Sequence, residues 1–344
     1  MANVLIIRLS SIGDVAMTIP VIYAVAHANP HDSFTVVTQS FLIPLFINKP
    51  ANIVMLGIDT KGREKKLVGF LRFAFGIARQ PYDTVLDLHN VIRSRILDLL
   101  CRLKGKHVFR LNKIRKERKR LTKRPPKRFS PLRTTIERYA DVFRNAGFRF
   151  EDTFTPFFAT PDDKPAMSLS FFGEKKGRWI GIAPFAKHVG KIYPVDLMEK
   201  VVDHVARQPD TTLFFFGNGE YEETILGRWE KKWHNAHCIA GRYNIPLTLE
   251  LIYRMDLVVC MDSAFMHFAA LTGTKVVSVW GATHPFLGFY GYRLNPEFAV
   301  QVELPCRPCS DYGKKPCYRN DYACLNQISP EQIIDKINFV WGEK

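Results

Sequence analysis

The sequence predicts an α/β protein with two domains of similar size, each built around a parallel sheet. The chain has 344 residues, which is long for a single hydrophobic core. Its hydrophobic content of 47% is sufficient for a large core. Short aliphatic stretches alternate with helix-like stretches along most of the chain, a pattern typical of βαβ units with helices on both faces of a sheet.

The first half shows this alternation from its start. Runs of β-branched and aliphatic residues predict buried strands at residues 3–9, 33–39, 52–58 and 83–89. Helical spacing predicts helices over residues 65–80, 93–103 and 134–148. Val15, Ile19 and Ile22 also follow helical spacing. We expect Pro20 to kink the chain there, because proline lacks the N–H that a helix interior needs.

A second series of strands and helices follows a proline-containing linker over residues 150–168. Strands are predicted at residues 178–184, 211–220, 256–263 and 275–281. Ser329 followed by Pro330 predicts the start of a last helix.

The domains are therefore expected at residues 1–160, with a basic insertion over about 102–133, and at residues 170–325. The helix at 329–344 is expected to pack back toward the N-terminal domain. Ligands of open parallel sheets bind beyond the carboxyl ends of the strands, so we expect a cleft where the two sheets face each other.

The net charge of +16 comes mainly from one segment. Residues 102–133 hold 15 Lys or Arg residues and one acidic residue, Glu117, a net charge of +14. Such a segment favours an acidic partner, for example a glycolipid phosphate or an anionic membrane surface. Clustered cations are also typical of nucleic-acid binding, but aromatic residues are few here. A solvated loop without a partner is a further alternative.

The N-terminus lacks the pattern of a signal peptide, and no stretch of 18 uncharged apolar residues occurs. We therefore expect a cytoplasmic protein with reduced cysteines. Four cysteines follow the spacing C-x2-C-x7-C-x6-C, at Cys306, Cys309, Cys317 and Cys324. Such a set could hold structural zinc, but its second half lacks a C-x2-C pair, so free thiols are the other possibility.

Asp14 follows the first strand at a helix start, after Ser11 and Gly13. It could simply cap the helix, or it could be a functional carboxylate on a tight turn. A second acid, Asp262, follows another buried strand in the same way. Small residues come next, and backbone N–H groups at such a helix start favour anions. This candidate anion site consists of Asp262, Ser263, Ala264 and His267.

Two further strand ends carry charged residues. Lys187 and Lys191 follow the strand at 178–184, where cations suit a diphosphate. Glu222 follows the glycine turn "FGNGEYEE" and could bind a ribose. This turn does not have the G-x-G-x-x-G spacing of dinucleotide-binding folds, and no phosphate-loop motif occurs. Arg93, at another predicted helix start, is a candidate for an acceptor phosphate.

Taken together, these stretches resemble glycosyltransferase family nine, the ADP-heptose:lipopolysaccharide heptosyltransferases. The start, "IIRLSSIGDVAMTIP", resembles that family's opening signature. The later passage "YDTVLDLHNVIRSRIL" resembles its "D-L-x-x-x-x-R/K-S" step. Residues 190–194 are similar to its "K-x-W-P" step, with Tyr193 in place of tryptophan. Its most specific stretch, "D-S-G-x-x-H-x-A", resembles residues 256–285.

The resemblance implies a GT-B fold, in which two Rossmann-like domains bind the acceptor and the nucleotide sugar. It makes Asp14 the general base and Lys191 the group that stabilises the leaving diphosphate. The donor-binding residues implied in this sequence are Ser11, Gly13, Lys187, Glu222, Asp262, Ser263, Ala264 and His267. The reaction would invert the anomeric centre without a metal ion or other cofactor, and no D-x-D triplet occurs in the chain.

The implied partners are ADP-heptose and an acidic glycolipid of the lipopolysaccharide core or a related surface glycan, at the inner face of the cell membrane. We expect acceptor contacts from Arg93, Arg115, Lys116, Lys119 and Arg120. Ala186, Lys187 and Ala264 depart from the family's usual residues, which leaves another nucleotide sugar as an alternative donor. A second alternative is a basic nucleic-acid-binding protein with a degenerate transferase core, although we expect no nucleic acid.

Overall fold

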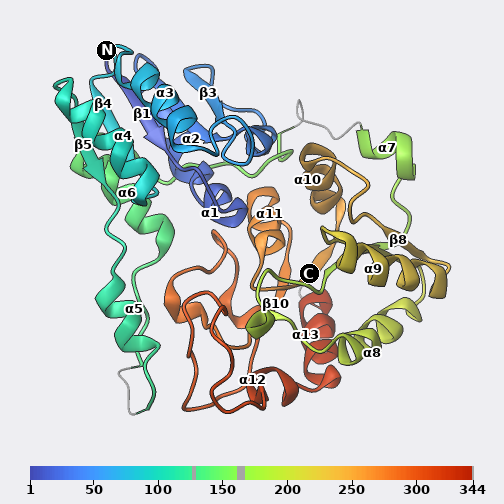
Figure 1. Cartoon of the computed structure of the whole chain (residues 1–344). Helices are drawn as coiled ribbons and strands as arrows, with labels where there is room; N and C mark the ends of the chain where they lie inside the picture. The colour runs from blue at the N-terminus through green and yellow to red at the C-terminus, as the bar shows by residue number, and fades with distance from the viewer. Residues whose placement is uncertain (126–128, 161–166, 343–344) are drawn as a thin grey trace. The chain divides into compact units, whose positions relative to one another are not determined.

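The computed structural model describes residues 1–125, 129–160 and 167–342. Its contacts divide the chain into two compact units (Figure 1). The first unit contains residues 1–114 and 133–155, and the second contains residues 115–132 and 156–344. Each unit has one parallel sheet with helices packed against it, which confirms the predicted fold class.

The sheet of the first unit has the strand order β3-β2-β1-β4-β5, and every pair in it is parallel. Its central strand β1 is almost entirely aliphatic and is buried from Val4 to Ile7. The strands are β1 (Asn3–Ile7), β2 (Ser33–Gln39), β3 (Ile53–Ile58), β4 (Thr84–Asp87) and β5 (His107–Arg110).

The helices of this unit include two where the sequence predicted one kinked segment. The chain breaks at Met17 and Thr18, and Pro20 is the second residue of the new helix, where its missing N–H is tolerated. The helices are α1 (Ile12–Ala16), α2 (Ile19–Ala28), α3 (Leu67–Ala78), α4 (Ile92–Leu103) and α6 (Thr135–Asn145), with a 3-10 segment over Ser40–Leu45.

The second unit repeats this arrangement with the strand order β11-β10-β9-β6-β7-β8, again parallel throughout. The strands are β6 (Arg178–Ala183), β7 (Thr211–Phe215), β8 (Ala236–Cys238), β9 (Leu257–Met261), β10 (Val276–Val279) and β11 (Ala299–Val300). All eight strands predicted from the sequence are present in the two sheets. The short strands β5, β8 and β11 were not predicted.

The helices of the second unit, apart from α5, are α7 (Met167–Phe172), α8 (Val195–Ala206), α9 (Glu220–Lys232), α10 (Ile245–Arg254), α11 (Ala264–Thr272), α12 (Ala323–Asn326) and α13 (Pro330–Gly342). The 3-10 segments are Val189–Lys191, Pro285–Leu287 and Pro296–Phe298.

The last helix packs within the second unit. Ile333, Ile337 and Val340 lie on one side of α13 and are buried in the core of the second unit, where the helix packs on α8 and on strands β9 to β11. Its apolar stripe is therefore used within this unit, and the packing of this helix toward the N-terminal domain stays a prediction.

The basic insertion is divided between the two units. Part of it forms β5 in the first sheet, but the helix α5 (Arg115–Leu121) groups with the second unit. Arg118 explains this placement, because it is only 5% exposed. Its guanidinium lies 4.4 Å from the ring centroid of Phe289 and donates a 2.9 Å hydrogen bond to the hydroxyl of Tyr312. Lys127 and Arg128 of the insertion, and residues 161–166 of the predicted linker, lie outside the described residues.

This contact predicts that Arg118→Ala lowers the free energy of unfolding by about 2 kcal/mol, because a desolvated cation–π contact and a hydrogen bond are lost together. Urea unfolding would measure the change, and trypsin should cleave the basic segment faster. The matched control is Arg120→Ala, an exposed arginine of the same helix, for which we expect no measurable change. Equal stability of the two variants would contradict a structural role for Arg118.

Candidate active site

In each sheet, the connections that follow one pair of neighbouring strands run in opposite directions along the sheet. We call this place the switch point. In the first unit this point lies between β1 and β4, and in the second between β6 and β9. The carboxyl ends of the strands at such a point form the usual ligand site of an open parallel sheet. The sequence-predicted residues Asp14, Lys191 and Asp262 all follow one of these four strands.

Asp14 is the third residue of α1, and its carboxylate is held by several donors. Its Oδ2 atom lies 2.8 Å from Nη2 of Arg8 and accepts a 2.7 Å hydrogen bond from the hydroxyl of Ser11. The backbone N–H of Ser11 donates to the same oxygen at 3.3 Å. Asp14 therefore caps its helix, as the simpler interpretation proposed, and it is also part of an ion pair.

Arg8 was missed by the sequence analysis, although it joins the two strands of the switch point. It is buried, and its Nη1 atom donates a 2.7 Å hydrogen bond to the carbonyl of Leu88, which follows β4. Its guanidinium also lies 5.7 Å from the ring centroid of Tyr139. An arginine within the aliphatic run "VLIIRL" was the available signal, because a buried cation requires a partner.

His89 follows β4 at the same switch point. Burial lowers the pKa of its imidazole to about 3, and the nearby charges of Arg8 and Lys113 contribute to the shift. The ring is therefore neutral at physiological pH, in contrast to the charged pair beside it.

In the second unit, Lys191 and Asp262 form an ion pair across the switch point. The Lys191 Nζ atom lies 2.8 Å from Oδ2 of Asp262, and the two side chains are 15% and 6% exposed. The hydroxyl of Thr283, which follows β10, donates to the same oxygen at 2.8 Å. The structure thus brings together two predicted residues and adds Thr283, a buried hydroxyl that no sequence pattern indicated.

Helix α11 begins next to this pair, at Ala264. Ser263 is the residue before its first turn, and within the described part of the chain its buried hydroxyl has no hydrogen-bond partner. His267 lies on the first turn and is buried. An orphaned hydroxyl beside the N–H groups of a helix start is suited to an anionic ligand.

Two predicted donor residues have other surroundings. The carboxylate of Glu222 accepts a 2.8 Å hydrogen bond from the backbone N–H of Asn218, so it closes its own turn. Burial raises the pKa of this carboxyl above its ordinary value. Lys187 is exposed, on the loop that follows β6.

Arg307 fixes the loop that carries Thr283. This arginine is 3% exposed, and it donates to the backbone carbonyls of Trp280, Gly281 and Thr283 at 3.2, 2.6 and 3.0 Å. The neighbouring Ala282 N–H donates to the carbonyl of Gly190, directly before Lys191. Arg307 therefore acts as a positioning residue for the loops around the ion pair.

The predicted acceptor residues fall into two groups. Arg93 is half-buried, donates to the backbone carbonyl of Lys65 at 3.0 Å and lies over the ring of Phe70. The other four are exposed on α5, and these are Arg115, Lys116, Lys119 and Arg120.

The cysteine-rich tail brings its four thiols around one small cavity of about 10 Å³, lined by Cys306, Cys309, Cys317 and Cys324. Nevertheless, no group of three or more His, Cys, Asp or Glu side chains within residues 1–125, 129–160 and 167–342 could hold a metal ion. The zinc alternative therefore gains no support from the structure, in which none of these four cysteines forms a disulfide.

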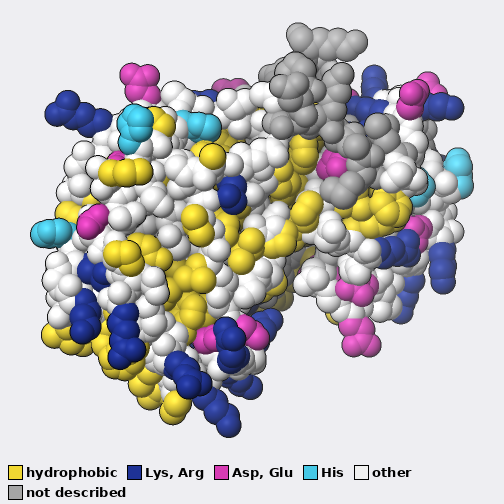
Figure 2. Space-filling view, turned by 90° about the horizontal axis from the view of Figure 1, so that it is seen from above, with side chains coloured by type: hydrophobic (Ala, Val, Ile, Leu, Met, Phe, Trp, Pro, Cys, Tyr) yellow, Lys and Arg dark blue, Asp and Glu magenta, His cyan; other side chains and the backbone are white. Residues whose placement is uncertain are grey.

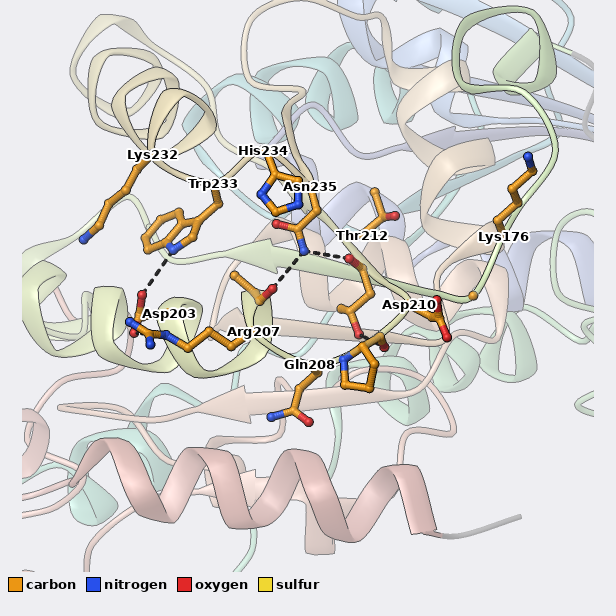
Figure 3. Close-up of a pocket in the computed structure, with 14 residues that line it drawn as sticks. Lys176, Asp203, Arg207, Gln208, Asp210, Thr212, Lys232, Trp233, His234 and Asn235 are labelled. Atoms are coloured by element: carbon orange, nitrogen blue, oxygen red, sulfur yellow. Dashed lines mark hydrogen bonds and ion pairs between the residues drawn. The ribbon is translucent and has the colours of Figure 1, made fainter.

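One hollow of the second unit lies away from these residues. It has a volume of about 820 Å³ and is lined by the segments that precede β6, β7 and β8 (Figure 3). Its polar groups bind one another: the Asn235 amide donates to the carbonyls of Ala206 and Thr211, and the Trp233 indole donates to Asp203. Since it lies at the amino ends of the strands, we do not assign the ligand site to it.

Two Rossmann-like units with charged groups at both switch points define an α/β protein of the class whose ligands bind beyond the carboxyl ends of the strands. The comparison with known families then gives a specific answer. Residues 70–317 match the model of glycosyltransferase family 9 (heptosyltransferase), and the chain belongs to this family.

Individual relatives agree with this assignment. The chain is 23% identical over 315 residues to lipopolysaccharide heptosyltransferase 3 of Escherichia coli, a match that covers 88% of this chain and 90% of that protein. It is 22% identical over 291 residues to the lipopolysaccharide core heptosyltransferase OpsX of Haemophilus influenzae, covering 81% and 79%.

Solved structures show the same fold. A glycosyl transferase family 9 protein from Veillonella parvula superimposes with a TM-score of 0.77 at 19% identity, covering 100% of this chain and 98% of that one. The Escherichia coli heptosyltransferase WaaC, solved with ADP-2-deoxy-2-fluoro heptose, gives a TM-score of 0.67 at 16% identity, covering 98% and 99%. The predicted GT-B fold is confirmed.

The buried ion pair predicts that Asp262→Asn lowers the free energy of unfolding by about 3 kcal/mol, because it leaves the Lys191 ammonium buried without its carboxylate. Adding Lys191→Met to this variant should recover most of the loss. Urea unfolding would measure both effects. In the control Asp203→Asn, the exposed Arg207 loses its carboxylate partner, while the new amide oxygen can still accept the Trp233 indole N–H, so we expect a change below about 1 kcal/mol. Equal losses in Asp262→Asn and the control would contradict the desolvated pair.

The pKa of His89 predicts that stability decreases as the pH falls below 6.5. Between pH 6.5 and 3 the unfolded chain binds a proton at this site that the folded chain does not, so protonation favours unfolding. At pH 5 the expected contribution is about 2 kcal/mol. Urea unfolding at pH 7.5 and pH 5 would test this, with His89→Gln losing correspondingly less than the wild type. The same loss in both proteins would show that His89 titrates normally in the fold.

Proposed function

We propose that this family 9 transferase moves a heptose from ADP-heptose to a lipopolysaccharide core or a related surface glycan, with inversion of the anomeric centre and without a metal ion. The observation that carries the proposal is the placement of charged side chains at both switch points, Asp14 in one unit and the Lys191–Asp262 pair in the other. Family membership supports sugar transfer, and the names of the relatives support heptose and lipopolysaccharide.

In the proposed step, a hydroxyl oxygen of the acceptor attacks the anomeric carbon of the donor. The new glycosidic bond forms as the bond to the diphosphate breaks, ADP leaves, and the hydroxyl proton passes to the carboxylate of Asp14. A carboxylate suffices as the base, since the hydroxyl becomes acidic as the new bond forms. Arg8 and Ser11 fix the carboxylate, so position is its main contribution.

The leaving diphosphate would be stabilised by the second unit. Lys191 is held by Asp262 and would exchange this carboxylate for the diphosphate when the donor binds. The Ser263 hydroxyl and the N–H groups at the start of α11 would bind further oxygens, with Ala264 and His267 beside them. Lysine and helix N–H groups would then perform the task of a divalent cation. Gly13, Lys187 and Glu222 complete the proposed donor-binding set.

The acceptor is proposed to be an acidic glycolipid at the inner face of the cell membrane. The exposed cations of α5, and Arg93 in the first unit, are its proposed phosphate contacts. Within the part of the chain that the structure describes, no helix is both long and apolar enough to cross a bilayer. Association with the membrane would therefore be peripheral in this proposal.

We predict that the purified protein releases ADP from ADP-heptose in the presence of core-oligosaccharide acceptors. Asp14→Asn should lower kcat by a factor of about 100 to 10,000, because the positioned base is lost. A chelator should leave the rate unchanged. The matched control is Asp83→Asn, a carboxylate at the opposite, amino end of the same sheet that accepts the Asn3 N–H, and it should keep full activity.

Other outcomes would revise specific parts of the proposal. ADP release that persists in Asp14→Asn would restrict this residue to capping its helix. Turnover of a different nucleotide sugar in place of ADP-heptose would support the alternative donor. No turnover with any donor, together with steeply salt-dependent binding of nucleic acid, would favour the degenerate transferase core.

A further inference from the structure

Helices α3 and α4 cover the same face of the first sheet. Phe70, Ala74 and Ile77 of α3 share one hydrophobic core with Leu97 and Cys101 of α4 and with the sheet below. The two helices also pack against each other. Their outward sides therefore form one continuous surface, which we call the α3–α4 surface.

The α3–α4 surface is apolar where an exposed helix side is usually polar. Six large hydrophobic side chains are about half exposed or more, namely Leu67 (62%), Val68 (80%), Phe75 (47%), Ile92 (79%), Leu99 (57%) and Leu103 (74%). In α3, Val68 and Phe75 are seven residues apart, and in α4, Ile92 and Leu99 have the same spacing. Seven residues correspond to about two helical turns, so each pair forms a row on one side of its helix. Contiguous exposed hydrophobic side chains of this kind mark an interaction site.

The charge of this surface has a single sign. Exposed Lys and Arg flank the hydrophobic rows, namely Lys65, Lys66, Arg72, Arg79, Arg95, Arg102 and Lys104. Residues 65–80 contain no acid, and residues 92–106 contain only Asp98, which is buried against Arg110. Figure 2 shows hydrophobic and basic side chains mixed in this way at its lower left. Beside α3, a hollow of about 790 Å³ opens toward the edge strand β3 and is lined in part by Val54, Leu56 and Phe73.

We propose that the α3–α4 surface is the face by which the protein rests on an anionic lipid bilayer. Its hydrophobic side chains would enter the boundary between headgroups and acyl chains, and its Lys and Arg residues would contact the anionic headgroups. A second copy of this chain fits less well, since a two-fold contact would oppose two strongly basic surfaces. The inference rests on the proposed function in one respect, that the acceptor is a glycolipid of that bilayer.

Helix α5 provides a comparison within the same chain. It exposes four cations, but its Leu121 is buried and none of the large exposed hydrophobic side chains lies on it. It can therefore attract headgroups but has no side chain to insert. The proposal thus assigns apolar contact with the bilayer to the α3–α4 surface, and attraction of the anionic headgroups alone to α5.

The test is co-sedimentation of the full-length protein with vesicles of phosphatidylcholine, with or without phosphatidylglycerol. We expect binding to the anionic vesicles and on the order of ten-fold weaker binding by Val68→Ser/Leu99→Ser. The matched control, Phe171→Ser/Phe339→Ser, removes two exposed hydrophobic side chains of the second unit and should bind like the wild type. Thermal unfolding should show that both double variants remain folded.

Other results would overturn the proposal. One is a wild-type protein that binds no vesicles; another is a Val68→Ser/Leu99→Ser variant that binds as well as the control. A dimer in light scattering that this variant alone converts to a monomer, without vesicle binding, would identify the surface as a self-contact. Turnover of ADP-heptose on a soluble acceptor is measured separately and should be equal in both double variants, so failure of the proposed function is recognised independently.

Discussion

Each unit of this protein depends on a buried polar contact at the switch point of its sheet, where charged side chains connect the segments that follow two neighbouring strands. At the switch point, the connections after two neighbouring strands run in opposite directions along the sheet, so the loops that begin there diverge. Arg8 spans this point in the first unit by binding both Asp14 and the Leu88 carbonyl. Lys191 and Asp262 span it in the second. Burying such charges opposes stability unless their contacts are close, so these pairs are more readily explained by function than by folding.

The surrounding residues serve to hold these bridges. Thr283 supplies a second donor to Asp262, and Arg307 fixes the loop on which Thr283 lies. This arginine comes from the cysteine-rich tail, so a segment without a metal-binding geometry still has a structural task. Burial lowers the pKa of the Arg307 guanidinium, whose charge is balanced by several carbonyl dipoles.

The sequence was sufficient to predict both sheets and to place several candidate residues after their strands, because these features depend on local patterns. A buried strand with an acid or a lysine in the segment that follows it is visible in one dimension, as for Asp14, Lys191 and Asp262. Arg8 and Thr283 could not be assigned in this way, since their roles depend on neighbours far along the chain. The surroundings of α5 could not be predicted for a related reason. In the sequence, a run of charged residues resembles a solvated loop, and the burial of Arg118 depends on the rings of Phe289 and Tyr312, which are distant along the chain.

The position of α5 also changes what can be treated as a module of this protein. The chain passes between the two units three times, after residues 114, 132 and 155. A fragment that begins at Pro156 would contain the whole second sheet but not Arg118, and the fragment before it would carry Arg118 without its aromatic partners. A single recombination crossover between the two sheets, natural or engineered, would therefore divide a buried contact. Chimeras with related transferases would need to exchange α5 together with the C-terminal half, even though it is encoded within the N-terminal half.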